Sequence, residues 1–312
     1  MIEAYQKELK NSLTICSGMA YRGPAVWREE LTRLTGRTAR VFGNGALFFE
    51  GDKDTLLVAN VDIPGLTVTN IDDGGFVWVD SEGLDAREWE HTALSLPGGE
   101  RCVLRAEVRY GEWSREDTEQ TSPLFADTGM RDAGEVRALV RPGDTLYVSG
   151  CVTELLNGTF HAPYAANAAA VALAFARTDG YPLAFAETEA QLRSVLETVR
   201  PARVLFVGTV KAPGAKKAPV GFEPAIGGGV AACGRGTLKS VIRDISFKAG
   251  IALFSGGLPA LDGTVSAYTE DRTYLQMPVR YGSHAKQTVS ARDAMCITAI
   301  VQMLTKGEGA NV

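Results

Sequence analysis

Residues that could carry chemistry are few in this sequence, and most of them stand alone. The chain contains only three histidines, namely His91, His161 and His284. Its five cysteines form no C-x-x-C pair and are scattered along the chain as Cys16, Cys102, Cys151, Cys233 and Cys296. This pattern argues against a disulfide framework and against a cysteine-based zinc site, and it predicts that the cysteines are small buried hydrophobic residues.

Lys211 and His284 are the candidate catalytic residues. Lys211 directly follows the apolar run RVLFVGTV. Its ammonium group could receive an anion or a carboxylate, or act as an amine of lowered pKa, but it could equally be a solvated lysine of the loop KAPGAKK. His284 follows closely after Arg280 and Tyr281. It could be a general base or a ligand in a pocket, or simply a polar surface residue.

Cys233 lies in the glycine-rich segment GGGVAACGRG. A pair of Cys233 with His284 would make a nucleophile. In the alternative interpretation, the glycines only allow the backbone to pass close to another segment. The segment lacks the form G-x-x-x-x-G-K-[ST], so it does not predict a phosphate-binding loop.

The elements that would position these residues are those of an α/β protein. Residues 1–40 indicate one or two helices, and short strands such as CVLRAEVRY dominate from about 75 to 150. After Gly158, helical segments such as NAAAVALAFART alternate with apolar strands such as RVLFVGTV, which is typical of strands buried on both faces. We expect residues 1–70 and 155–312 to form an α/β domain whose mostly parallel central sheet is flanked by helices. A small inserted β-barrel domain over residues 71–154 divides it.

Composition excludes several function classes. The net charge is −5, and no basic cluster predicts a nucleic-acid groove. No apolar run approaches the roughly 18 residues of a membrane span. The polar N-terminal segment MIEAYQKELKNSL is not typical of a secretory signal, so we expect a cytoplasmic protein without nucleic-acid or membrane partners.

Several segments, taken together and in order, resemble metallopeptidase family 42, the glutamyl or deblocking aminopeptidases that assemble into hollow tetrahedral particles. The resemblance implies the zinc-aminopeptidase fold, and it implies a homo-oligomer because the inserted domain mediates contacts between subunits in that family. The matching segments are GPAVWREELTRLTG, LLVANVDIPGLTVTNIDDGGFVWV, PLFADTGMRDAGEVRALVRPGDTLYVSGCVTELLNGTF, APYAANAAAVALAFA, FVGTVKAPGAKKA and MPVRYGSHAKQTVSARD.

The chemistry of that family rests on two zinc or cobalt ions held by two histidines and three carboxylates, with a further glutamate as general base. The third carboxylate has no counterpart here, because no acidic residue lies between Glu223 and Asp244. The other matching positions carry side chains that are not typical metal ligands. They are Asn60 for the first histidine, Ala166 for the bridging aspartate, Ala212 and Pro213 for the paired glutamates, and Ser283, next to His284, for the closing histidine.

Asp62 matches an aspartate of the family pattern. In the family, that residue orients the first histidine. It could stabilise a turn, or it could pair with Lys211 across the space that the metals would occupy. His161 and Tyr164 precede Ala166 and could line the same cleft. The predicted pocket therefore comprises Asn60, Asp62, His161, Tyr164, Asn167, Lys211, Cys233, Arg280, Ser283 and His284.

Two functions fit this pattern. The first is a catalytically degenerate aminopeptidase homologue without a resident metal or other cofactor, which keeps the fold and the assembly surface and binds a peptide-like or amino-acid-like ligand or a partner. The second is an active hydrolase or aminopeptidase. It would use an unorthodox zinc or cobalt site, or metal-free chemistry through Lys211, His284 or Cys233.

Overall fold

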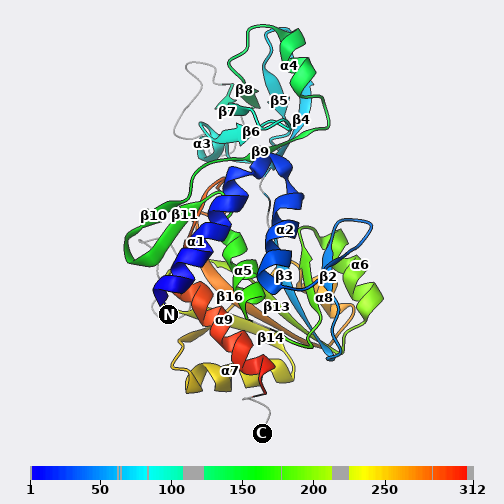
Figure 1. Cartoon of the computed structure of the whole chain (residues 1–312), viewed down its shortest axis with the longest axis vertical. Helices are drawn as coiled ribbons and strands as arrows, with labels where there is room; N and C mark the ends of the chain where they lie inside the picture. The colour runs from blue at the N-terminus through cyan, green and yellow to red at the C-terminus, as the bar shows by residue number, and fades with distance from the viewer. Residues whose placement is uncertain are drawn as a thin grey trace, which may run out of the picture.

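A mixed eleven-stranded sheet forms the centre of the larger part of the structure (Figure 1). The computed structural model describes residues 2–61, 63, 65–82, 84–107, 123–176, 178–212, 225–282 and 284–307. The strands follow the order β1-β2-β12-β3-β13-β16-β17-β11-β10, and β14 joins β16 and β15. Their bounds are β1 (Arg40–Val41), β2 (Leu47–Phe49), β3 (Thr55–Asn60), β10 (Thr153–Leu155), β11 (Thr159–Ala162), β12 (Leu183–Ala186), β13 (Arg203–Lys211), β14 (Val230–Arg235), β15 (Leu253–Ser255), β16 (Asp271–Arg280) and β17 (Gln287–Ser290).

Four neighbouring strands at the centre, β12, β3, β13 and β16, are parallel, as the sequence predicts. Their carboxyl ends therefore meet at one edge of the sheet. In β3, Leu57 and Ala59 face one hydrophobic core, whereas Leu56 and Val58 face another, because successive side chains point to opposite faces. Burial on both faces explains the continuous apolar texture of these strands.

The strands beyond β16 are antiparallel. Residue Thr288 in β17 pairs with Arg280 in β16 and with His161 in β11, so these three residues form one row across the sheet. Phe160 and Val289 face the opposite side and belong to the main core. One face of this part of the sheet is thus covered by helices, and the other carries polar side chains.

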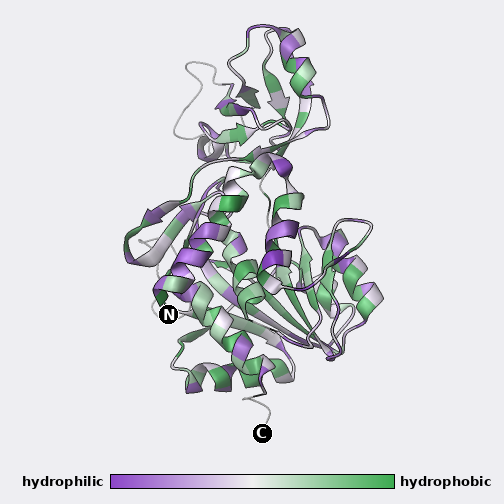
Figure 2. Cartoon of the chain, in the orientation of Figure 1, coloured by the Kyte–Doolittle hydropathy of each residue, from purple (hydrophilic) through white to green (hydrophobic). Residues whose placement is uncertain are grey.

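Helices cover both faces of the parallel centre. One layer consists of α1 (Ile2–Gly18), α2 (Pro24–Thr35), α5 (Ala168–Phe175), α7 (Thr237–Lys248) and α9 (Ala291–Thr305). The other contains α6 (Glu189–Val199) and α8 (Asp262–Ser266). Hydrophobic and hydrophilic residues alternate along α6 (Figure 2), because only its inner side is buried. Within the described residues, no helix is both long enough and apolar enough to cross a membrane.

Helix α5 lies at the centre of the first layer. Its residues Ala168 to Ala174 are all buried, and they are mostly alanines. Small side chains let α5 pack against α2, α9 and the sheet at once. The described residues of the main part also form the short 3₁₀ turns η1 (Ala20–Arg22), η2 (Leu156–Gly158) and η3 (Ala165–Asn167).

A closed six-stranded antiparallel barrel lies at one end of the long axis (Figure 1). It has its own core, which includes Leu94, Leu104, Leu124 and Leu146. Its strands are β4 (Gly65–Ile71), β5 (Val77–Val79), β6 (Ala93–Ser95), β7 (Arg101–Ala106), β8 (Leu124–Asp127) and β9 (Thr145–Val148), and it also carries α3 (Ala86–Trp89) and α4 (Ala133–Leu139).

The barrel begins earlier than the boundary at residue 71 that we drew from the sequence. Strand β4 starts at Gly65 and pairs with β9, so all but its last residue precede that boundary. At the other end, β10 starts at Thr153 and pairs with β11 of the large sheet. The reason is hydrogen bonding: each short strand belongs to the sheet where it finds partners for its backbone groups.

Candidate functional site

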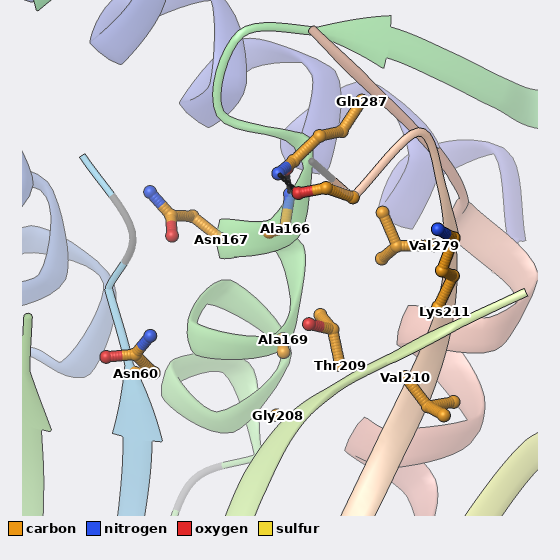
Figure 3. A pocket seen from close by; sticks show the side chains of 11 residues that line it. Asn60, Ala166, Asn167, Ala169, Gly208, Thr209, Val210, Lys211, Val279 and Gln287 are labelled. Carbon is orange, nitrogen blue, oxygen red and sulfur yellow. Dashed lines mark hydrogen bonds between the residues drawn. The ribbon is translucent and has the colours of Figure 1, made fainter. Parts of the chain in front are cut away.

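A cavity of about 390 Å³ opens at the carboxyl edge of β3 and β13. The ends of these strands meet the segment η3–α5 and Gln287 (Figure 3), and Gly282 also lines the cavity. The residues that line it are Asn60, Ala166, Asn167, Ala169, Gly208, Thr209, Val210, Lys211, Val279, Gly282 and Gln287.

Parallel pairing brings the predicted residues Asn60 and Lys211 to this edge. Asn60 is the last residue of β3, and Lys211 is the last residue of β13, where it pairs with Val279 of β16. Across the cavity, Asn167 ends η3 and is fully buried. In Figure 3, Asn60 and Asn167 lie on one side and Lys211 on the other. Asn60, Asn167 and Lys211 thus line one cavity.

Gln287, which sequence reasoning missed, connects the two walls. Its side-chain oxygen accepts a hydrogen bond from the backbone N–H of Ala166 at 2.9 Å. Its side-chain nitrogen donates to the carbonyl of Gly282 at 3.2 Å. No sequence signal marked this glutamine, because a lone amide has no motif. The pair of bonds holds η3 against the chain segment before β17.

Among the described residues that line this cavity, the polar groups are three carboxamides, one hydroxyl and one ammonium. The carboxamides of Asn60, Asn167 and Gln287 can both donate and accept hydrogen bonds. Lys211 is exposed and supplies the only charge of that lining. Chemically, this arrangement suits a small ligand that has amide-like groups and a negative charge.

The three histidines gather in a second cleft, of about 330 Å³, between the barrel and the large sheet. The prediction that His161 and His284 line the Asn60 cavity is therefore wrong: both border this separate cleft instead. The Nε2 atom of His284 lies 3.2 Å from a carboxylate oxygen of Glu88 in α3. Ala285 is buried in the barrel core, and this contact draws the neighbouring His284 away from the Asn60 cavity.

His161 is held in this second cleft by the sheet. Its Nδ1 is hydrogen-bonded to the hydroxyl of Thr288 at 2.9 Å, and its ring packs edge-on to Tyr281. Burial, together with the charges of Lys286 and His284, lowers the pKa of His161. The neutral imidazole is therefore favoured, which suits hydrogen bonding to Thr288.

Cys233 and Tyr164 do not line the Asn60 cavity. Cys233 is buried with Tyr274 on the face of the sheet that α6 and α8 cover, and its thiol donates to the carbonyl of Gly257 at 3.0 Å. Burial raises the pKa of Cys233 to about 11, which opposes the thiolate that a nucleophile needs. The predicted pair with His284 is thus not assembled. Tyr164 is almost fully buried in the main core.

Three predicted residues, Asp62, Pro213 and Ser283, lie outside the described residues, so the pairing of Asp62 with Lys211 stays a prediction. Arg280 lines a third cavity, on the outer face of β17. Within the described part of the chain, no three His, Cys, Asp or Glu side chains form a group that could hold a metal ion.

A buried carboxylate organises the glycine-rich segment. Asp293 in α9 is fully buried and accepts hydrogen bonds from the backbone N–H groups of Gly227 at 2.6 Å and Gly229 at 3.1 Å. Burial raises its pKa to about 6, although these two bonds act in the opposite direction. The glycine-rich segment is thus anchored to α9 by a side chain that sequence reasoning did not single out.

Solved aminopeptidase structures share this architecture. An aminopeptidase from the archaeon Desulfurococcus kamchatkensis is 17% identical, with 97% of this chain and 95% of that chain covered at a TM-score of 0.79. A TET aminopeptidase from a marine sediment Thaumarchaeota archaeon is 15% identical. The match covers 97% of this chain and 96% of that chain, at the same TM-score of 0.79. The TET1 peptidase of Pyrococcus horikoshii can assemble into a tetrahedron or a large octahedral shell. It is 19% identical, and the match covers 98% of this chain and 99% of that chain at a TM-score of 0.74.

Such low identities over nearly complete chains show a common fold. The chain has the fold of the metallopeptidase family 42 aminopeptidases, with a large mixed sheet between helices and a closed barrel. No protein-family model matches the sequence, and no curated protein matches it.

Proposed function

We propose that this chain is a catalytically degenerate aminopeptidase homologue that binds an amino-acid-like or peptide-like ligand in the Asn60–Lys211 cavity. The observation that carries the proposal is the lining of that cavity. It lies at the carboxyl edge of the parallel strands, where α/β folds bind ligands, but its described lining offers amides and one lysine rather than carboxylates and imidazoles.

The two metal ions of the aminopeptidases do not fit this donor set. Asn60 is a neutral and weak donor, and the side chain of Ala166 has no donor atom. Zinc and cobalt need imidazole or carboxylate ligands, and two dications also need negative charge to neutralise them. The ammonium group of Lys211 would instead repel a cation, because both carry positive charge.

The same groups support ligand binding. Lys211 can receive the carboxylate of an amino-acid-like ligand, and the carboxamides of Asn60 and Asn167 can pair with its amide groups. The cavity volume of about 390 Å³ is within the range of sites that hold small molecules.

We also propose that the chain forms a homo-oligomer through the barrel. The Pyrococcus horikoshii peptidase of the same fold assembles into closed shells, which supports this proposal.

Metal content and peptidase activity test the proposal together. Purified protein should hold far less than one zinc or cobalt ion per chain, measured by elemental mass spectrometry. It should not turn over aminoacyl-p-nitroanilides in the presence of added cobalt, while a genuine aminopeptidase in the same assay does. Two stoichiometric metal ions per chain, or turnover that a chelator abolishes, would overturn the proposal in favour of an active hydrolase.

A further inference from the structure

A third cavity, of about 780 Å³, lies on the opposite side of β17 from the Asn60 cavity. Gln287 faces the Asn60 cavity, whereas Thr288 and Ser290 line this one. Alternation along β17 accounts for the difference, because neighbouring residues of a strand point to opposite faces. The two cavities are therefore separate sites that share one strand.

The floor of this third cavity is built by the sheet. Arg280 is paired with Thr288, and Ser290 is paired with Thr159, so these four residues present their side chains side by side. The hydroxyl residues Thr288 and Ser290 are buried. Thr288 is hydrogen-bonded to His161 at 2.9 Å, and Ser290 accepts from the backbone N–H of Arg292 at 3.2 Å. The hydroxyl groups are thus held in place beneath the opening.

Two guanidinium groups, from Arg280 and Arg292, give this cavity its charge. Neither forms an ion pair with a carboxylate of the described residues, and the described lining contains no acidic side chain. Asp293 is next to Arg292 in sequence, but its carboxylate is buried and bound to the N–H groups of Gly227 and Gly229. Within the described residues, this cavity therefore carries two positive charges and no neutralising carboxylate.

Part of the lining is apolar. Leu155 ends β10, and Leu156 begins η2 with 87% of its side chain exposed. Ile226 lines the cavity as well. The turn that follows these leucines contains Asn157 and Gly158, which both have positive φ. Leu155, Leu156 and Ile226 thus offer an apolar surface in the same lining as the two arginines, which the apolar part of a ligand could cover.

We propose that this third cavity is a second ligand site, which binds a small molecule consisting of an oxyanion joined to an apolar chain. The planar guanidinium groups of Arg280 and Arg292 match the oxygen geometry of a carboxylate or a phosphate, and the hydroxyl group of Ser290, which accepts from Arg292, can donate to the same oxygens. Leu155 and Leu156 would cover the apolar chain. This site is independent of the proposed function of the Asn60 cavity.

Calorimetric titration of the full chain tests this assignment with four probes: hexanoate, hexyl phosphate, inorganic phosphate and hexylammonium. We expect saturable binding of hexanoate or hexyl phosphate, weaker binding of inorganic phosphate, and no binding of hexylammonium. The tighter of the two hexyl probes identifies the headgroup as a carboxylate or as a phosphate. No saturable binding of either hexyl probe, or equal binding of hexylammonium, would overturn the proposal.

Matched variants locate the site. Arg280→Gln and Arg292→Gln should each weaken binding of the hexyl probe by about tenfold, because each removes a charge-assisted hydrogen bond. Leu156→Ser should weaken hexyl binding but leave inorganic phosphate unchanged. Arg243→Gln, at an exposed position of α7, is the control and should change neither. Binding that is insensitive to both Arg280→Gln and Arg292→Gln would refute the site, and circular dichroism confirms that each variant is folded.

Discussion

The side-chain oxygen of Gln287 lies 2.9 Å from the backbone nitrogen of Ala166 and accepts its hydrogen bond. From the sequence resemblance to the aminopeptidases, we expect Ala166 to stand where those enzymes have the bridging aspartate. At this position the chain has a structural hydrogen bond, which joins η3 to β17 and shapes the cavity. The cavity is therefore maintained by contacts within the chain.

We expect Gln287→Ala to destabilise the protein. Gln287 is buried, and its loss would leave the N–H of Ala166 and the carbonyl of Gly282 without their partner. An unsatisfied buried group costs about 1–3 kcal/mol. Urea unfolding measures this change. Lys7→Ala, on the exposed side of α1, is the control and should change stability by less than about 0.5 kcal/mol. Equal stabilities of the two variants would contradict the bracing role of Gln287.

Lys211→Met should weaken the binding of a carboxylate ligand in the Asn60 cavity. N-acetylalanine is a suitable probe, because it has one amide and one carboxylate. We expect a loss of about tenfold in affinity by calorimetry, since a charge-assisted hydrogen bond is removed. The neutral amide of N-acetylalanine should bind equally to both proteins, and Lys248→Met at the end of α7 should have no effect. Unchanged affinity for the carboxylate would exclude Lys211 as its receptor.

Asp293 should make the protein more stable as the pH falls from 7 towards 4. Burial raises its pKa in the folded protein from 3.8 to about 6, so between these values the folded state binds the proton more readily than the unfolded state. The stabilisation from this proton is fully present below about pH 4 and is lost as the pH rises through 6.

Asp293→Asn isolates this contribution, because the variant has no carboxyl group to titrate at that position. The free energy of unfolding of the native protein minus that of the variant should increase between pH 7 and pH 4. Urea unfolding at several pH values measures this difference. The contributions of the other titrating groups are the same in both proteins and therefore cancel. A difference that stays constant or falls with decreasing pH would show that the pKa of Asp293 is not raised.

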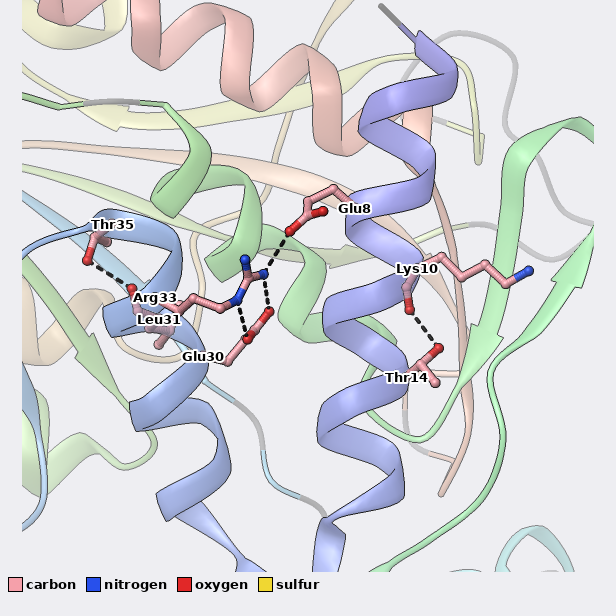
Figure 4. A network of polar contacts seen from close by, with 7 residues as sticks. All are labelled: Glu8, Lys10, Thr14, Glu30, Leu31, Arg33 and Thr35. Carbon is pink, nitrogen blue, oxygen red and sulfur yellow. Dashed lines mark hydrogen bonds and ion pairs between the residues drawn. The ribbon is translucent and has the colours of Figure 1, made fainter.

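Glu30 and Glu8 bind the same guanidinium group but should not contribute equally to stability (Figure 4). Glu30 is buried and accepts two hydrogen bonds from Arg33, at 2.9 and 2.7 Å, whereas Glu8 is 42% exposed and accepts one. We expect Glu30→Gln to cost about 1–3 kcal/mol and Glu8→Gln less than about 1 kcal/mol, because an exposed ion pair is screened by water. Urea unfolding of both variants at pH 7 checks the order, and a larger effect at Glu8 would contradict it.

The sequence by itself determined the fold class. The apolar run of β13 and the alanine-rich α5 could be recognised because burial on all sides requires a continuous apolar sequence. In the structure, the parallel strands then place Asn60 and Lys211 at a common edge. The start of the barrel was harder to predict, because only its pairing with β9 shows that β4 belongs there.

Only the tertiary structure decided which candidates share a site. His284 follows Arg280 by four residues, yet they border different cavities, because Ala285 docks into the barrel core and carries His284 to Glu88. Gln287 and Thr288 are adjacent in sequence and likewise face different cavities. The direction of a side chain depends on strand register and on the contacts of the preceding turn, and these are set by partners far away in the sequence.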